Sequence, residues 1–248
     1  MFDPVEMAEL TRNIVCKNNQ RKYYRFRSSR FYGGISTADT VGCCLRCIFC
    51  WSWNVVTRPQ ECGNYYSPEK VARKLIAIAK RKKLRQLRIS GNEPTICREH
   101  LIQVLALIPE DYLFILETNG ILIGKDFTYA EELSRFPNLY VRVSLKGTCG
   151  EEFSRLTGAI PEAFQLQLKA LEHLIKCKII VHPACMISFS PPENIAALRK
   201  RLKAINPAFE EFEVEELILY PSVEERLNKL KADYITWHRP ESIPAEQI

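Results

Sequence analysis

The sequence lacks several features that define large classes of protein. No apolar run approaches the length of a membrane span, and the chain has no low-complexity tract or internal sequence repeat. The first residues lack the basic and then apolar pattern of a signal peptide, so we expect a cytoplasmic protein without a membrane partner. Neither a phosphate-binding glycine loop nor a Ser-His-Asp grouping occurs, so nothing supports an NTPase or a hydrolase.

The chain has ten cysteines, but their spacing does not suit the two common uses of many cysteines. Disulfide scaffolds occur in short secreted chains, and this chain has 248 residues. A zinc ribbon needs a second close pair besides Cys47 and Cys50, and none exists. We interpret the scattered cysteines as small core or surface residues, with an auxiliary cluster as the less favoured alternative: Cys16, Cys62, Cys97, Cys149, Cys177 and Cys185.

Three cysteines do form a compact pattern. Cys43, Cys47 and Cys50 are spaced Cys-x3-Cys-x2-Cys, and a short loop can turn three such thiolates inward to hold a small metal cluster. An iron–sulfur cube normally takes four thiolates, so three leave one iron open to bind a ligand. Cys44 lies within this loop, but a residue adjacent to a ligand usually points away, and we leave it out of the ligand set.

The formal net charge of +6 is unevenly distributed. Basic and aromatic residues alternate near the N-terminus: Lys17, Arg21, Lys22, Tyr23, Tyr24, Arg25, Phe26, Arg27, Arg30, Phe31 and Tyr32. Such a mixture can hold phosphates and stack bases, but an extension packed on the main domain is the favoured interpretation. A second basic run, 80–83, suits the negative end of a helix dipole.

From residue 34 the chain alternates between predicted strands and helices. The predicted strands are 34–41, 86–90, 112–117, 139–144, 178–182 and 214–219, and the predicted helices begin near residues 4, 68, 96, 129, 161 and 192. This alternation predicts an α/β fold with a parallel sheet that is buried on both faces. An open doubly wound sheet and a barrel share the pattern, and six units are fewer than the eight that close the usual barrel.

Four of these strands are followed by unusual residues. The cysteine loop follows the first strand, Ser90-Gly91-Asn92-Glu93-Pro94 follows the second, Thr118-Asn119-Gly120 ends the third, and Ser144-Leu145-Lys146-Gly147 ends the fourth. Ligands of parallel α/β folds bind beyond the carboxyl ends of the strands. Any one segment alone would be an ordinary turn. Because all four fall at the same edge, we expect them to form one ligand site.

Together these motifs resemble those of the radical S-adenosylmethionine (SAM) enzymes. The cysteine triplet, with Phe49 before its last cysteine, resembles the family's signature, and segment 91–94 is similar to its Gly-Gly-Glu-Pro motif, with Asn92 at the second position. In that family the open iron chelates SAM, and one electron cleaves a carbon–sulfur bond to give methionine and a 5′-deoxyadenosyl radical. The resemblance implies a partial (β/α)6 TIM-like barrel over 35–221, an N-terminal helical and basic extension over 1–34, and a tail over 222–248.

The resemblance also implies a [4Fe–4S] cluster, SAM and a set of residues that contact them. The implied cluster ligands are Cys43, Cys47 and Cys50, and the implied SAM contacts are Phe49, Ser90, Gly91, Asn92, Glu93, Pro94, Thr118, Asn119, Ser144, Lys146, Arg155 and His182. Glu93 would accept from the ammonium group and Lys146 would pair with the carboxylate of SAM. Arg155 is either a second carboxylate partner or an exposed helix arginine, and His182, at a strand's end, would touch adenine or substrate.

In size and motifs the chain most resembles the pyruvate formate-lyase activating enzymes, which act on a partner protein. The resemblance implies an external electron donor such as flavodoxin or ferredoxin. We therefore expect a protein substrate, for glycyl-radical activation or peptide modification. The alternative is a tRNA- or nucleotide-modifying enzyme, because the loop 48–51 is similar to that of tRNA-modifying members. A non-catalytic electron-transfer protein is less favoured, and it predicts four cysteine ligands.

Overall fold

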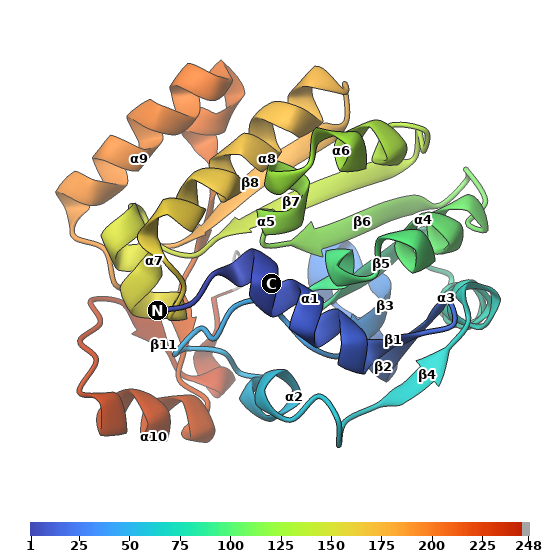
Figure 1. Cartoon of the computed structure of the whole chain (residues 1–248), viewed down its shortest axis with the longest axis horizontal. Helices are drawn as coiled ribbons and strands as arrows, with labels where there is room; N and C mark the ends of the chain where they lie inside the picture. The colour runs from blue at the N-terminus through green and yellow to red at the C-terminus, as the bar shows by residue number, and fades with distance from the viewer. Residues whose placement is uncertain (245–248) are drawn as a thin grey trace.

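A computed structural model describes residues 1–244, and its centre is a sheet of six parallel strands (Figure 1). In spatial order these are β3 (Ile35–Thr40), β5 (Gln86–Gly91), β6 (Leu113–Thr118), β7 (Leu139–Leu145), β8 (Ile180–Met186) and β9 (Glu213–Glu215). Each strand pairs in parallel with the next, and among the described residues β9 does not return to pair with the first strands. The predicted α/β fold and partial barrel are confirmed.

Helices connect these strands and cover one face of the sheet. They are α3 (Pro68–Lys82), α4 (Arg98–Ala106), α5 (Ile121–Lys125), α6 (Phe127–Leu133), α7 (Gly150–Thr157), α8 (Phe164–Lys176) and α9 (Pro192–Ile205). In α3, Ser67 caps the first turn by accepting from the Lys70 amide, and Val71 and Leu75 are buried against the sheet. The short helices α5 and α7 were not predicted, because neither is long enough to show a clear helical period.

The N-terminal segment packs against the edge of this sheet. Helix α1 (Pro4–Val15) leads through β1 (Cys16–Lys17) into β2 (Gln20–Ser29), which pairs antiparallel with β3 and with β4 (Asn64–Tyr66). Arg21, Lys22 and Tyr23 are buried, and the Lys22 ammonium donates to two backbone carbonyls. The predicted packed extension is confirmed. Arg21 and Lys22 face the interior and so cannot contribute to a nucleic-acid surface, whereas Lys17 and Arg30 are exposed.

The C-terminal segment also folds onto the molecule. The predicted last strand is divided into β9 and β10 (Leu217–Ile218), and β10 pairs in parallel with β11 (Trp237–His238). Helix α10 (Pro221–Leu230) lies between them, and α2 (Trp53–Thr57) follows the cysteine loop. The division into segments 1–34, 35–221 and 222–248 stays a prediction, and residues 245–248 lie outside the described residues.

Two further observations bear on the expected class of protein. Within residues 1–244 no helix is long and apolar enough to cross a membrane. Cys16 and Cys97, which we interpreted as small core or surface residues, form a disulfide. They are 81 residues apart in the sequence, and the fold brings the end of α1 beside the start of α4. The spacing of the two cysteines in the sequence does not predict this pairing.

Candidate functional site

The cysteine loop is fixed to the carboxyl-terminal edge of the sheet by backbone and side-chain hydrogen bonds. The amides of Arg46 and Ile48 donate to the carbonyls of Thr157 and Leu156 at the end of α7, at 3.0 and 2.9 Å. From α10, the Arg226 guanidinium donates to the carbonyls of Ile48 and Cys50, both at 2.6 Å. Arg226 was not predicted, because nothing in the local sequence of α10 indicates a contact with a loop some 176 residues earlier.

The three predicted ligand thiols belong to one loop at this edge. The Cys43 sulfur lies 3.8 Å from the Asn119 side-chain nitrogen, and the Cys50 sulfur lies 3.6 Å from the Ser52 hydroxyl. Cys47 is buried, and burial raises the pKa of its thiol. Within residues 1–244 no three His, Cys, Asp or Glu side chains converge as ligands of a single ion must. Three thiols spread over a loop fit a cluster of several irons better than one tetrahedral zinc.

Cys44 is buried and turned toward the β6 loop. Its Sγ accepts from the Asn119 side-chain amide at 3.2 Å, and hydrogen bonding between its thiol and Cys43 lowers the pKa of Cys43. The same interaction, with burial, raises the pKa of Cys44 well above its usual range. The contact with Asn119 connects the cysteine loop to the end of β6.

The segment after β5 approaches the cysteine loop closely. Gly91 has φ +79°, and a Cβ atom there would lie 2.9 Å from the Cβ of Asp39, so only glycine fits. Asn92 donates to the Thr40 carbonyl at 2.6 Å and accepts from the Ser52 hydroxyl at 3.1 Å. Ser52 in turn lies 3.6 Å from the Cys50 sulfur. The asparagine that departs from the family motif thus joins this segment to a predicted cluster ligand through Ser52, which was not predicted.

The Glu93 carboxylate is fully buried and joins two segments of the site. It accepts from the Thr118 hydroxyl at 2.6 Å and from the Asn119 amide at 2.8 Å, and also from Thr95. The predicted segments after β5 and β6 are therefore brought together. A direct role for the Glu93 carboxylate toward an ammonium group stays a prediction, and its present partners all belong to the protein.

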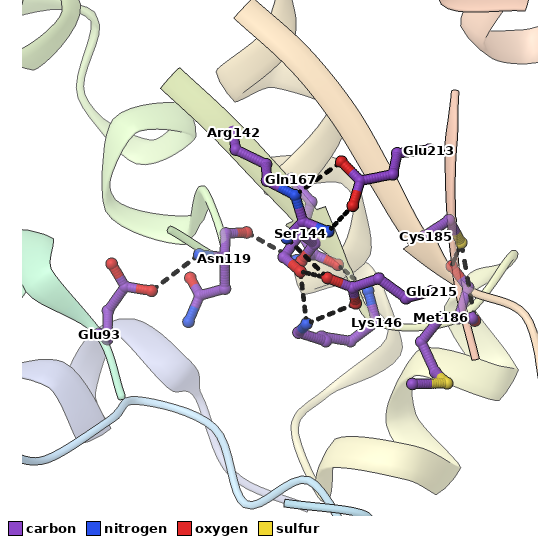
Figure 2. Close-up of polar contacts among 11 residues, drawn as sticks. Glu93, Asn119, Arg142, Ser144, Lys146, Gln167, Cys185, Met186, Glu213 and Glu215 are labelled. Atoms are coloured by element: carbon purple, nitrogen blue, oxygen red, sulfur yellow. Dashed lines mark hydrogen bonds and ion pairs between the residues drawn. The ribbon is translucent and has the colours of Figure 1, made fainter. Parts of the chain in front are cut away.

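Gln167 of α8 connects the ends of β6 and β7, as Figure 2 shows. Its side-chain amide donates to the carbonyls of Asn119 and Ser144 at 2.6 and 3.1 Å, and its oxygen accepts from the Lys146 amide. The residue is fully buried. Its signal in the sequence was a glutamine on the otherwise apolar face of a helix, three residues after Phe164, and this signal was missed.

Lys146 lies in a charged network on the face of the sheet opposite the helices (Figure 2). Its ammonium donates to the Ser144 hydroxyl at 2.7 Å and is 3.4 Å from the Glu215 carboxylate. Arg142 is paired with Glu215 at 2.7 Å and with Glu213. Sequence reasoning found Ser144 and Lys146 but missed their acidic partners, because β9 is too short to show an alternation of buried charges.

Three predicted residues lie at the margins of this arrangement. The predicted end of β8 is wrong, because the strand continues through Pro183 to Met186, which leaves His182 in its first half. The His182 ring faces Glu213 at 3.8 Å. Arg155 is half exposed on α7 and donates to the Phe189 carbonyl at 3.4 Å, and the Phe49 ring lies 5.5 Å from that of Phe189. The roles of these residues toward SAM stay predictions.

The comparisons with known proteins agree with this geometry. A sequence profile of the Radical SAM superfamily matches residues 38–205, and the chain therefore belongs to this superfamily of enzymes. A search of curated protein sequences finds no match. Similar solved structures include Streptococcus suis SuiB bound to S-adenosylmethionine, with a TM-score of 0.60 and 18% identity over 83% of this chain and 52% of SuiB.

Two other solved structures are similar at the level of the fold. Native anSMEcpe with bound AdoMet and the Cp18Cys peptide has a TM-score of 0.56 and 19% identity, over 75% of this chain and 50% of its own. TYW1 with a lysine-pyruvate adduct bound has a TM-score of 0.53 and 15% identity, over 79% of this chain and 71% of its own. This chain spans about half the length of SuiB and anSMEcpe.

The superfamily implies a [4Fe–4S] cluster and SAM, and the residues present fit both groups. Cys43, Cys47 and Cys50 offer three soft thiol donors in one loop, which is the ligand type that iron–sulfur clusters use. After β7, Lys146 offers a cation that could pair with a carboxylate. The subtype of the pyruvate formate-lyase activating enzymes stays a prediction.

Proposed function

We propose that this protein is a radical SAM enzyme that abstracts a hydrogen atom from a peptide or protein substrate. The observation that carries the proposal is one site that contains three loop cysteines, the Glu93–Asn119 pair and the Lys146 cation at the carboxyl ends of adjacent strands. Cys43, Cys47 and Cys50 would hold the cluster and leave one iron open. When bound, the reduced cluster supplies the electron that cleaves SAM to methionine and a 5′-deoxyadenosyl radical.

In this proposal the protein's own residues orient SAM. The Lys146 ammonium, held now by Ser144 and Glu215, would pair with the carboxylate of SAM. The positive φ at Gly91 lets backbone approach a ligand, as in the related motif. Asn92 and Asn119 contact Ser52 and Cys44, and so keep the strand ends in register with the cysteine loop.

A peptide substrate is favoured over RNA by two observations. SuiB has been solved bound to its precursor peptide SuiA, and anSMEcpe has been solved with the Cp18Cys peptide. Four of the basic N-terminal residues that would have suited RNA are engaged within the protein: Arg21 and Lys22 are buried, and Arg25 and Arg27 are paired with Asp39. Flavodoxin or ferredoxin is the expected electron donor.

Anaerobic reconstitution with iron and sulfide, followed by dithionite and SAM, tests the proposal. We expect 5′-deoxyadenosine to form in the wild-type chain and to disappear when Cys43, Cys47 or Cys50 is changed to Ala. Cys62→Ala is the matched control, because Cys62 is partly exposed on the segment between α2 and β4. Equal product from the triplet variants, or a cluster held by four cysteines, would contradict the proposal.

A further inference from the structure

The inner face of the sheet, opposite the helices, carries a row of charged side chains rather than the apolar layers of an ordinary barrel. Arg88 is paired with Glu117 at 2.8 Å, and the Tyr32 hydroxyl donates to the same carboxylate. Arg142 uses all three guanidinium nitrogens on Glu213 and Glu215. In this part of the row, each arginine is therefore paired with carboxylates of the same row.

The wall formed by β2 and β3 differs from the rest of the row. Arg25 and Arg27 both bind one oxygen of Asp39, at 2.6 and 3.1 Å, and each does so only through its Nε atom. Among residues 1–244 their terminal nitrogens have no hydrogen-bond partner. Asp39 is buried, while the side chains of Arg25 and Arg27 are 39% and 27% exposed. Two arginines that share one carboxylate leave a net charge of about +1 at this wall.

Tyr24 adds an unpaired hydroxyl to the same place. Its oxygen is buried and has no hydrogen-bond partner, which is uncommon for a buried polar atom. Burial raises the pKa of Tyr24, and the charges that act on it come from Asp39, Arg25, Arg27 and Cys50. The Arg25 guanidinium lies 5.4 Å from the centre of the Tyr24 ring, so the phenol is adjacent to this arginine. Tyr24 is the extra residue of an irregularity in β2, between Tyr23 and Arg25 in the register with β3.

The arginines are also adjacent to the cluster loop through an aromatic contact. The Arg25 guanidinium lies 5.5 Å from the centre of the Trp51 ring, and Trp51 directly follows Cys50. Asp39 holds both arginines at their inner ends, so the outer nitrogens of each fork are oriented and available. A pair of oriented guanidinium forks recognises a planar or tetrahedral oxyanion by several parallel hydrogen bonds.

We propose that Tyr24, Arg25 and Arg27 form an oxyanion site that binds a carboxylate of the substrate beside the cluster loop. This inference rests on the proposed function, since it assigns the site to the substrate of that reaction. A carboxylate is favoured over a phosphate because its single negative charge matches the net charge of the wall, whereas a phosphate dianion would exceed it. In a peptide, such a group is an Asp or Glu side chain or the terminal carboxylate.

Isothermal titration calorimetry on the reconstituted full chain, without a reductant, tests this site. The probes are N-acetyl-glutamate amide, the neutral N-acetyl-glutamine amide and inorganic phosphate, at one ionic strength. We expect saturable binding of the glutamate probe that falls at least about tenfold in Arg25→Gln and Arg27→Gln, and about two- to fivefold in Tyr24→Phe. Arg85→Gln is the control, because Arg85 is 82% exposed and should leave binding unchanged.

Each other outcome counts against the inference. Equal binding of the glutamate and glutamine probes, or binding that survives loss of either arginine, would overturn it. Arginine-dependent binding of phosphate that exceeds that of the glutamate probe would overturn the carboxylate and indicate a nucleotide-type ligand. If Arg25→Gln fails to fold, Arg25→Lys and Tyr24→Phe take its place in the same binding comparison. No turnover is involved, so failure to cleave SAM with intact probe binding would remove the proposed function and leave the site.

Discussion

Glu215 is the carboxylate that joins Lys146 to the charged inner face. Burial by itself would raise the pKa of Glu215, but the charges of Lys146 and Arg142 outweigh burial and lower the pKa to about 2. An unfolded glutamate titrates near pH 4.3. Because the folded pKa is the lower one, the stabilisation is present above about pH 4.5 and is lost as the pH falls toward 2.

Glu215→Gln should therefore destabilise the cluster-free chain at pH 7 by about 1–3 kcal/mol, with a smaller difference from wild type at pH 3.5. Urea unfolding at the two pH values measures the free energy of unfolding of each protein. Glu61→Gln serves as the control, because Glu61 is largely exposed beside Arg58. A difference that stays constant with pH would show that the charge of Glu215 is not stabilised in the folded state.

Among single residues, the sequence identified those whose partners are close along the chain. Cys43, Cys47 and Cys50 fall within eight residues, so their spacing alone indicates a common loop. Gln167 and Arg226 act on the same site from distant helices, and a glutamine or an arginine has no spacing rule to reveal its partner.

Helix α10 is the element that supports the cluster loop from outside the part that matches the superfamily. Its Arg226 donates to the carbonyls of Ile48 and Cys50 and lies 4.7 Å from the centre of the Trp53 ring. These carbonyls have no other hydrogen-bond donor among residues 1–244. Loss of the guanidinium should leave them unpaired and loosen the loop.

Arg226→Met should speed amide hydrogen exchange at Ile48 and Cys50 by about tenfold, which corresponds to roughly 1.4 kcal/mol of local stability. It should also lower the iron and sulfide retained per chain after reconstitution. Lys229→Ala on the same helix is the control, because Lys229 is 73% exposed and paired only with Glu225. Unchanged exchange and unchanged iron content in Arg226→Met would exclude a supporting role for α10.

Most elements were predictable because their signals are short-range. The capped helices α1 and α3 begin at the predicted residues, Pro4 and Pro68. The end of β8 was misplaced because Pro183 normally ends a central strand, since it has no N–H to donate. Here the strand passes through the proline between β7 and β9, and tertiary pairing outweighs the local preference.

For the whole molecule, the disulfide between Cys16 and Cys97 joins the N-terminal hairpin to the helical layer. The Arg21 guanidinium donates to the Cys97 sulfur at 3.1 Å and, from another nitrogen, to the Glu93 carbonyl at 2.8 Å. The closed loop is long, with a sequence separation of 81 residues, so the cross-link restricts the unfolded chain strongly.

Cys16→Ser should lower the free energy of unfolding by about 2–4 kcal/mol under non-reducing conditions. Denaturant unfolding measures this change, with Cys177→Ser as a control that removes a free thiol. Thiol titration of the denatured, cluster-free wild-type chain should find eight free cysteines. Ten reactive thiols would show that this disulfide does not form.

The overall topology was predictable only as a class. Six strand–helix units predict a parallel sheet, but an open sheet and a barrel have the same pattern, and the motif resemblance decided between them. The antiparallel pairing of β2 with β3 was not predicted, because the basic residues of β2, Arg21, Lys22, Arg25 and Arg27, hide its hydrophobic period. Their partner, Asp39, belongs to a different strand, so this arrangement becomes apparent only in the folded chain.

The hydrogen bonds from Arg226 to the cysteine loop have a consequence for the order of events during synthesis. The loop that receives the cluster emerges from the ribosome early, whereas the guanidinium that fixes two of its carbonyls follows 176 and 178 residues later. A nascent chain that ends before α10 therefore lacks the guanidinium that holds these two carbonyls. Iron delivery to this protein should accordingly be a late, post-translational step that follows docking of the C-terminal helix.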